Sequence, residues 1–219
     1  MKKYLNTLKQ CPLFSDITDT DLLNMLQCLN ARIDTFARNQ TILMEGTPAK
    51  SVGIVLSGAV AIVRDDYYGN RTIVAHIEEM QLFAETFACA DIEHMPVSAI
   101  AACDSEIMFI DCKRILTICS NTCKFHTLLV NNLLRIVATK NILLNQKIEV
   151  TAKRTTRDKL MTYLMIQAKK NNADTFTIPY DRQALADYLG VERSAMSAEI
   201  SKLRKEGIIE CRKNLFRLL

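Results

Sequence analysis

An acidic side chain in an apolar setting is the first feature of the sequence that could do chemistry. Residues 82–98 read LFAETFACADIEHMPVS, and Glu85 lies there between apolar and small neighbours, in a stretch without Lys or Arg. A carboxylate in such surroundings needs partners, because burying it alone is costly. Two explanations stay open. Either Glu85 binds a hydroxylated or amine-bearing small molecule, with Thr86 and Ser98 beside it, or it caps a helix or pairs with an Arg elsewhere, such as Arg71.

A second candidate is the segment CSNTCKFH, which spaces Cys119, Cys123 and His126 at i, i+4 and i+7. On a helix the three side chains would share a face, as metal ligands can. No fourth ligand is obvious, and reduced, buried thiols are the ordinary interpretation of eight scattered cysteines. We therefore predict no metal site and keep metal or redox sensing through these three residues as an alternative.

The sharpest pattern is a helical hairpin in DRQALADYLGVERSAMSAEISKLRKEG, residues 181–207. Leu185 and Leu189 lie one turn apart on its first helix, and Gly190 suits the left-handed backbone of a tight turn. The apolar stripe of the second helix consists of Met196, Ile200 and Leu203. The hairpin therefore has one face that must be buried and one that stays open.

The open face of the second helix carries short or basic side chains: Arg193, Ser194, Ser197, Ala198, Ser201 and Lys202. Such side chains allow a helix to sit deep in the major groove of DNA. Arg193, near the helix N-terminus, is suited to a guanine edge, whereas Lys202, Arg212 and Lys213 suit phosphates. The alternative is an ordinary amphipathic hairpin with a solvated basic face.

Hydrophobic periodicity predicts the elements that position these residues. Residues 3–30 are mostly helical with a break near Pro12, and Thr18 or Thr20 is the expected cap of the helix that follows. Between 31 and 111, short segments rich in Val and Ile predict antiparallel strands, hence a small barrel or jelly roll. Helices at about 156–170, 182–189 and 192–206, a strand at TFTIPY and a final ribbon complete an α+β fold.

Residues 121–149 contain no Gly or Pro and predict one long helix with two apolar lines. The first line runs Val130, Leu134, Val137, Asn141, Leu144 and Ile148, and the second runs Leu129, Leu133, Ile136 and Leu143. One line would pack on the barrel and the other on a second copy, with Asn141 fixing the register. A helix simply buried in one domain is the alternative. The polar segment EVTAKRT, residues 149–155, is a plausible hinge.

Charge and composition narrow the functional classes. Residues 151–219 have a net charge of +6 and residues 1–150 of −2, which suggests a polyanion partner, usually nucleic acid. No uninterrupted apolar run reaches the roughly 20 residues of a membrane span, and MKKYLNTLKQ is not a signal peptide, so we expect a cytoplasmic protein. No Ser-His-Asp ordering, phosphate-binding Gly loop or carboxylate pair indicates an enzyme.

The chain resembles the Crp/Fnr family of transcription regulators over residues 5–219. The markers are CPLFSDI, EGTPAKSVGIVLSGAVAI, ETFACA and LADYLGVERSAMSAEISKLRKEGII. The resemblance implies a cyclic-nucleotide-binding-type jelly roll at 1–118, a long dimerisation helix at 119–150 and a winged helix-turn-helix at 151–219. It also implies double-stranded DNA with a palindromic operator, a second copy of the chain and RNA polymerase as partners.

The resemblance assigns roles in the hairpin residue by residue. In the family the first residues of the recognition helix read bases, and Arg193 and Ser194 match those positions. A further Arg often stands where this chain has Ala198, so the preferred half-site should differ or be relaxed. Arg182 and Gln183 match positions that touch the DNA backbone.

The resemblance also gives an expectation for the effector. Members that bind cyclic AMP use a Gly-Glu pair before a short helix and an Arg about ten residues later, which neutralises the phosphate. Here Ala84 precedes Glu85, and the Arg position falls on Met95 or Val97. A buried phosphodiester without a cation would face a large desolvation cost. We therefore expect a small molecule other than cyclic AMP.

Family members read the base of their ligand from the long helix, which adds Thr139 and Asn141 to the candidate pocket of Glu85, Thr86 and Ser98. Two rivals remain. One is a constitutive DNA binder whose barrel has lost its ligand. The other is a regulatory subunit whose C-terminal hairpin binds protein rather than DNA.

Overall fold

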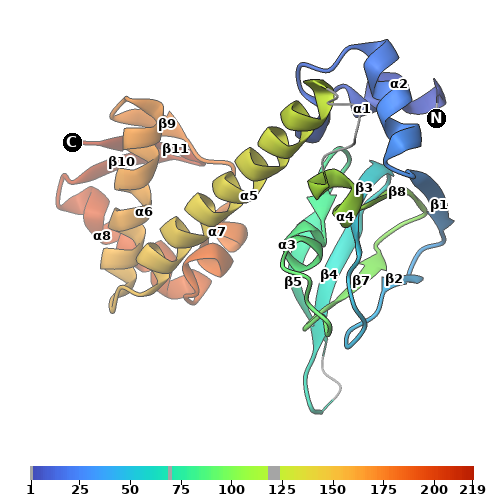
Figure 1. Cartoon of the computed structure of the whole chain (residues 1–219). Helices are drawn as coiled ribbons and strands as arrows, with labels where there is room; N and C mark the ends of the chain where they lie inside the picture. The colour runs from blue at the N-terminus through green and yellow to red at the C-terminus, as the bar shows by residue number, and fades with distance from the viewer. Residues whose placement is uncertain (1, 69–70, 118–123) are drawn as a thin grey trace. The chain divides into compact units, whose positions relative to one another are not determined.

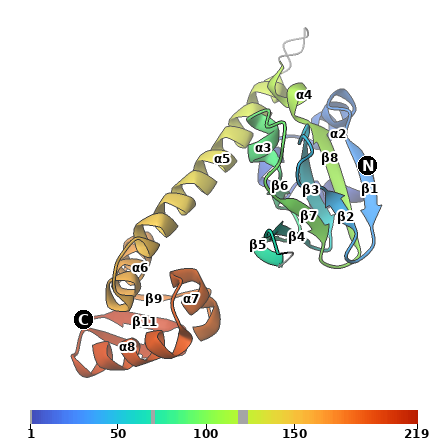
Figure 2. The ribbon, with the colours of Figure 1, turned by 90° about the horizontal axis from the view of Figure 1, so that it is seen from below.

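The computed structural model describes residues 2–68, 71–117 and 124–219 (Figures 1 and 2). The chain divides into two compact units, Met1–Ala138 and Thr139–Leu219. Their boundary falls inside one long helix, α5, Lys124–Thr151, so each unit is described by itself. The three ranges predicted above stay a prediction, because a division into two compact units does not test whether a dimerisation helix stands between them.

The N-terminal segment of the first unit is helical, as predicted. It forms η1 (Lys2–Tyr4), α1 (Leu5–Leu8), η2 (Pro12–Phe14) and α2 (Asp19–Cys28). Pro12 starts η2, a position where its missing N–H is not needed. The Thr18 hydroxyl accepts a hydrogen bond from the Asp21 N–H at 3.4 Å, so Thr18 rather than Thr20 is the cap.

The strands of the first unit form two antiparallel sheets. They are β1 (Arg32–Phe36), β2 (Thr41–Leu43), β3 (Ser51–Ser57), β4 (Val60–Asp65), β5 (Arg71–Ile77), β6 (Leu82–Phe83), β7 (Ser98–Ala101) and β8 (Ser105–Asp111). One sheet has the order β1-β8-β3-β6 and the other β2-β7-β4-β5. The mixed class and the β-rich N-terminal part are confirmed, and the jelly-roll connection stays a prediction. Strand β6 was not predicted because it is only two residues long.

Strand β3 has a core on each side, because successive side chains point to opposite faces. Ile54 packs in the cluster shared with the N-terminal helices and α5, whereas Val55 packs in the cluster between the two sheets. Gly53 is required here, because a Cβ at this position would lie 2.3 Å from a ring atom of Phe83. The Phe83 ring in turn meets Phe109 edge-on at 6.3 Å.

Two short helices join the sheets to the long one, namely α3 (Glu85–Cys89) and α4 (Cys112–Leu116). The start of α5 is bonded to both α4 and the N-terminal segment. His126 Nε2 donates to the Ile115 carbonyl at 2.7 Å, and Asn132 Nδ2 donates to the carbonyls of Leu13 and Ser15 at 3.1 and 3.0 Å. These bonds, together with the burial of Leu129 and Leu133, anchor the first turns of α5.

Many apolar side chains of α5 are exposed in the single chain: Leu134, Ile142, Leu143, Leu144 and Ile148. By length and composition alone, the span Phe125–Thr151 could also cross a membrane, and 17% of its most apolar window is buried. Such a test is also passed by helices that pack against protein. A series of exposed apolar residues of this kind marks a candidate interaction surface.

The second unit combines a helical hairpin with a small sheet. It contains α6 (Thr156–Asn171), β9 (Thr175–Thr177), α7 (Arg182–Leu189), α8 (Arg193–Lys205), β10 (Ile209–Arg212) and β11 (Leu215–Leu218), with the sheet order β10-β11-β9. The predicted helices, strand and ribbon are confirmed. The predicted hinge at 149–155 is wrong at its start, because α5 continues to Thr151 and Val150 is fully buried in the core of this unit.

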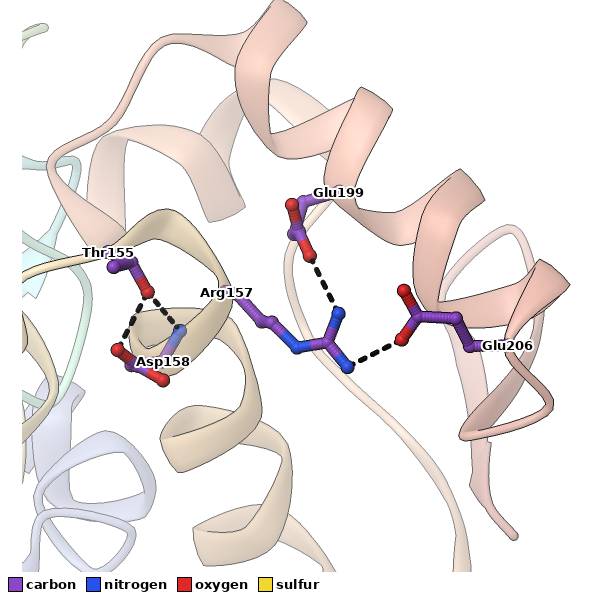
Figure 3. A network of polar contacts seen from close by, with 5 residues as sticks. All are labelled: Thr155, Arg157, Asp158, Glu199 and Glu206. Carbon is purple, nitrogen blue, oxygen red and sulfur yellow. Dashed lines mark hydrogen bonds and ion pairs between the residues drawn. The ribbon is translucent and has the colours of Figure 1, made fainter.

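An ion-pair network ties α6 to α8 (Figure 3). Arg157 Nη1 lies 3.4 Å from Glu199 Oε1, and Arg157 Nη2 lies 2.6 Å from Glu206 Oε2. Thr155 caps α6, since its hydroxyl accepts from the Asp158 N–H at 3.0 Å and donates to the Asp158 carboxylate at 2.7 Å. Arg157 is thereby held in the first turn of α6, where it faces Glu199 of α8 and Glu206 at the C-terminal end of α8.

The network was not predicted, although the sequence contains a signal for it. Glu199 and Glu206 lie two turns apart on one side of an otherwise basic segment. Two carboxylates so placed on one side of a helix can share a single cation from another element. Arg157 supplies it, and its hydrogen bond holds the pKa of Glu206 below the ordinary value of 4.5.

This pKa shift predicts how the network responds to acid. A carboxyl whose pKa is lowered by folding contributes stability above its ordinary pKa and loses it as the pH falls through the folded value. The Arg157→Gln variant should therefore unfold at lower urea concentration than the wild type at pH 7. The difference between the two midpoints should shrink as the pH falls below about 4.5. Tyrosine fluorescence of the full chain measures both transitions.

Arg217→Gln provides the matched control, because Arg217 pairs with Glu210 at 3.6 Å through more exposed side chains. Exposed ion pairs contribute little. Equal losses for the two variants, or a loss in Arg157→Gln that is independent of pH, would contradict the assigned role of the network.

Candidate functional site

The hairpin of the second unit presents one face of α8 to water. Met196, Ile200 and Leu203 are buried against the core of the unit, as the periodicity predicted. Every α8 side chain predicted to face DNA is exposed: Arg193, Ser194, Ser197, Ala198, Ser201 and Lys202. Arg193 is the first residue of the helix, which puts its long side chain at the N-terminal end. The arrangement matches what a helix entering a major groove requires.

Two details of that face bear on which of its polar side chains are free to contact a base. The Ser201 hydroxyl donates to the Ser197 carbonyl at 3.0 Å, a bond that occupies its hydrogen within the helix. Glu192 precedes the helix in an extended conformation and makes no side-chain cap bond to it. Arg193 and Ser194 are therefore the polar side chains best placed to reach a base edge from the first turn.

The turn between α7 and α8 depends on Gly190. This residue has φ +61° and ends α7 in the left-handed conformation. Its N–H bonds the Asp187 carbonyl at 3.2 Å, and the next N–H, of Val191, bonds the Ala186 carbonyl at 3.1 Å. A residue with a Cβ would pay a steric cost in this conformation, which explains the glycine.

The two residues predicted to touch the DNA backbone, Arg182 and Gln183, lie at the start of α7. The Arg182 guanidinium lies over the Phe216 ring at 5.2 Å, and its Nη2 is 3.5 Å from Cys211 Sγ. It is therefore half-buried and held in one orientation. Gln183 is exposed, and its Nε2 donates to Asp187 at 2.9 Å.

A hollow next to Arg182 is also lined by residues of the turn between β10 and β11, which form the wing of the predicted winged helix-turn-helix. It has a volume of about 510 Å³ and is lined by Pro179, Tyr180, Asp181, Arg182, Lys213 and Asn214. Lys213 lies in the turn between β10 and β11 with φ +54°. The structure thus gathers Arg182 and Lys213, which are 31 positions apart in the sequence, on one side of the unit. Two cations so close suit a phosphate backbone.

The candidate effector residues are not gathered within one compact unit. Glu85, Thr86 and Ser98 belong to the first unit, whereas Thr139 and Asn141 lie on the part of α5 that belongs to the second. Thr139 and Asn141 are both exposed, and Asn141 accepts a hydrogen bond from Asn145 at 2.7 Å.

Glu85 is buried, with 3% of its surface exposed, at the first position of α3. The exposed Thr86 hydroxyl donates to Glu85 Oε1 at 3.4 Å. Ser98 Oγ, by contrast, accepts from the Glu45 N–H at 2.9 Å. The suggested pairing with Arg71 is wrong, because Arg71 bonds both carboxylate oxygens of Asp65 at 2.9 Å.

The backbone before Glu85 bears on one departure from the cyclic AMP pattern. Ala84 has φ +61° and ψ −1°, a left-handed conformation that favours glycine. A residue with a Cβ has a steric cost in this conformation, and nothing in the structure explains why Ala rather than Gly stands here. The second departure is chemical. Met95 and Val97, where a cation would be expected, are both buried apolar side chains.

The proposed metal or redox group falls mostly outside the described residues, since Cys119 and Cys123 are not among them. His126 is described, and its Nε2 is bonded to the Ile115 carbonyl. Among residues 2–68, 71–117 and 124–219, no group of three His, Cys, Asp or Glu side chains could hold a metal ion.

Comparisons with known proteins agree with this geometry. The sequence matches the family model of the cyclic nucleotide-binding domain over residues 33–122 and that of the Crp-like helix-turn-helix domain over residues 158–219. Together the two matches cover more than half of the chain. A search of curated protein sequences found no match.

Solved structures share the fold. The catabolite activator protein of Thermus thermophilus is 18% identical, with 95% of this chain and 93% of that chain covered and a TM-score of 0.56. DNR of Pseudomonas aeruginosa is 20% identical, with coverages of 100% and 95% and a TM-score of 0.52. The c-di-GMP-responsive global regulator CLP of Xanthomonas campestris is 16% identical, with coverages of 89% and 97% and a TM-score of 0.52.

The two family models match the two parts of the chain in which the structure has its β-rich domain and its exposed α8. The chain accordingly belongs to the Crp/Fnr family of DNA-binding transcription regulators, with a cyclic-nucleotide-binding-like sensing domain.

Proposed function

We propose that this protein is a homodimeric regulator that binds a palindromic operator in double-stranded DNA and responds to a small molecule other than cyclic AMP. The observation that carries the proposal is the exposed face of α8. Its buried side is apolar, and its open side holds only short or basic side chains from Arg193 to Lys202. The hollow with Arg182 and Lys213 supports a contact with the phosphate backbone beside it.

The roles of the recognition residues follow from their length and charge. Arg193 is the proposed base reader, with Ser194 beside it, whereas Ser197, Ala198 and Ser201 are short enough to let the helix approach the groove floor. Lys202, Arg182 and Gln183 are proposed to touch phosphates. Since Ala198 has no hydrogen-bonding group, the half-site should be read by fewer direct bonds than a second Arg would provide.

A second copy of the chain is the proposed cover for the apolar residues of α5. Leu134, Leu144 and Ile148 are between 54% and 65% exposed, and they share one line of the helix with Val130, Val137 and Asn141. The first unit buries Leu129 and Leu133 of the other line, and it also partly buries Val130 and Val137 of this line. The exposed apolar part of the line is therefore Leu134, Leu144 and Ile148. Two copies joined along it would present two recognition helices to two half-sites about one DNA turn apart.

The effector proposal rests on charge. Glu85 is buried, and no Lys or Arg occurs between Arg71 and Lys113. A hydroxylated or amine-bearing ligand could bond the Glu85 carboxylate without bringing an anion into the barrel, with Thr86, Ser98, Thr139 and Asn141 as further candidate contacts. The burial of Met95 and Val97 favours a second candidate, a constitutive DNA binder with a ligand-free barrel.

A regulator of this kind acts where the chromosome is. We therefore propose a cytoplasmic location, no membrane insertion of α5, and RNA polymerase as a further partner if the protein activates transcription. No catalytic role is proposed.

The first prediction concerns base reading. Arg193→Ala should weaken binding to the preferred DNA site by roughly 1–3 kcal/mol and weaken binding to random DNA much less, because a base contact is lost. Fluorescence anisotropy on both duplexes measures the two affinities, and Arg38→Ala, an exposed Arg of the first unit, is the control. Equal losses on both duplexes would reduce Arg193 to a phosphate contact.

The salt dependence of the same titration tests the function itself. A basic reader that displaces counterions should lose affinity steeply as the salt concentration rises. Affinity for DNA that is negligible at low salt would instead favour a hairpin that binds protein.

The second prediction concerns the dimer. Leu144→Glu should convert the dimer to a monomer, because it puts a charge into the proposed seam, and operator affinity should fall with it. Ile142→Glu is the matched control: it is equally exposed, at 58%, but points away from the line of Leu134, Asn141 and Ile148. Sedimentation equilibrium measures the mass. A wild-type monomer, or equal dissociation by both variants, would count against the seam.

The third prediction concerns the effector. Isothermal calorimetry with cyclic AMP and cyclic GMP should detect no binding in the micromolar range, because the barrel supplies no cation for the phosphate. Micromolar affinity for either nucleotide would overturn the exclusion. Operator affinity with and without a small-molecule extract then separates a sensing barrel from a ligand-free one.

A further inference from the structure

Two cysteines face each other where the short helices α3 and α4 meet. Cys89 is the last residue of α3 and Cys112 the first of α4, and their Sγ atoms lie 3.4 Å apart. The two helices lie side by side in Figures 1 and 2. A disulfide requires the sulfurs to approach from this distance to about 2.05 Å, a change that rotation of the two side chains would have to supply.

The two thiols differ in access. Cys112 is buried, with 1% of its surface exposed, whereas Cys89 is partly exposed at the edge of the same core. A hydrogen bond from the Cys112 thiol lowers the pKa of Cys89, and this effect outweighs burial and the nearby Glu85 carboxylate, which both raise it. The same bond and burial raise the pKa of Cys112. Cys89 is therefore the thiol that ionises and meets a reagent first.

The other described cysteines lack this combination. Cys11 is fully buried, and burial raises its pKa to about 11, so it is inert. Cys28 and Cys103 are exposed and Cys211 is partly exposed, but within the described residues none of the three faces another cysteine. Cys211 Sγ lies 3.5 Å from Arg182 Nη2 instead. Exposure and a resolving thiol are found together at Cys89, as at thiols that sense oxidants.

We propose that Cys89 and Cys112 form a reversible oxidation site that reacts with hydroperoxides and closes to an intramolecular disulfide between α3 and α4. The Cys89 thiolate attacks the outer peroxide oxygen and the O–O bond breaks. The leaving alkoxide takes up the proton lost by Cys89, and Cys89 becomes a sulfenic acid. The Cys112 sulfur then attacks the Cys89 sulfur, the S–O bond breaks, and hydroxide leaves as water with the Cys112 proton. The two thiols lose two electrons, and the hydroperoxide is reduced to an alcohol and water.

The location of the disulfide connects it to the rest of the first unit. The α3 end of the pair belongs to the helix that begins at Glu85. Two residues of α4 near Cys112 contact other helices. The Ile115 carbonyl accepts a hydrogen bond from His126 of α5, and Arg114 donates one to the Cys28 carbonyl of α2 at 3.0 Å. Oxidation would therefore bond the candidate effector helix covalently to the helix against which α5 is anchored.

The bond can be detected by peptide mapping of the full-length protein. Trypsin alone leaves residues 72–113 as one peptide with Cys89, Cys103 and Cys112, because no Lys or Arg lies between Arg71 and Lys113. Cleavage after Glu as well separates the three cysteines into residues 86–93, 94–106 and 107–113. Reduced protein is treated with stoichiometric hydrogen peroxide, its remaining thiols are alkylated, and it is then digested.

The expected product is the peptide 86–93 joined to 107–113, which dithiothreitol separates. Cys103→Ser should leave this product unchanged, and Cys89→Ser should abolish it. Loss of the exposed Cys28 or Cys103 thiol before that of Cys89 would overturn the proposal, as would oxidation of Cys89 without bond formation. This mapping uses the wild-type protein first, so it does not depend on the folding of a variant.

The effect on DNA rests on the proposed function and is measured separately. Operator affinity should change by about fivefold or more on oxidation, the lower range of coupling between distinct sites, and should return with dithiothreitol. An unchanged affinity despite the mapped disulfide would refute the coupling. Absence of DNA binding by the reduced protein would instead refute the proposed function.

Discussion

The proposed DNA contact depends on which face α8 presents to water. The burial of its apolar side chains determines that face. Met196, Ile200 and Leu203 are removed from water on one side of α8, each by an amount worth roughly 1.5–3 kcal/mol. Rotating the helix about its axis would expose them, so the opposite face from Arg193 to Lys202 must point outward. Arg157 adds a directional constraint through Glu199 and Glu206, because an ion pair, unlike an apolar contact, specifies which atoms meet.

The same network resolves a charge conflict. Carboxylates on a DNA-binding helix repel the phosphates of the DNA. Arg157 pairs with both Glu199 and Glu206 and offsets one of their two negative charges (Figure 3). The exposed side chains from Arg193 to Lys202 are short or basic, which gives the open face its positive character. The hollow beside Arg182 extends that character to the wing, where Lys213 comes from a different part of the chain.

The first unit retains the form of a nucleotide-binding cassette and lacks part of its chemistry. Ala84 still adopts the left-handed conformation, and Glu85 still opens a short helix. The position expected to neutralise a phosphate is filled by buried apolar side chains instead. Burying an anion without a cation is costly, and this cost is the basis for proposing a ligand other than cyclic AMP. The adjoining Cys89–Cys112 pair gives this cassette a second chemistry that needs no bound ligand.

The sequence alone determined the features that depend on period and local conformation. The Val- and Ile-rich segments, the two lines of α5, the turn at Gly190 and the stripe of α8 each follow from side-chain spacing, which acts within a few residues. The tertiary structure decided which side chains meet: Arg157 with Glu199 and Glu206, Cys89 with Cys112, and Arg71 with Asp65 rather than Glu85. It also put Arg182 and Lys213 in the lining of one hollow. It also decided where α5 ends, because Val150 is buried in a core that is built from later residues. Such contacts depend on how elements pack, and no local pattern encodes packing.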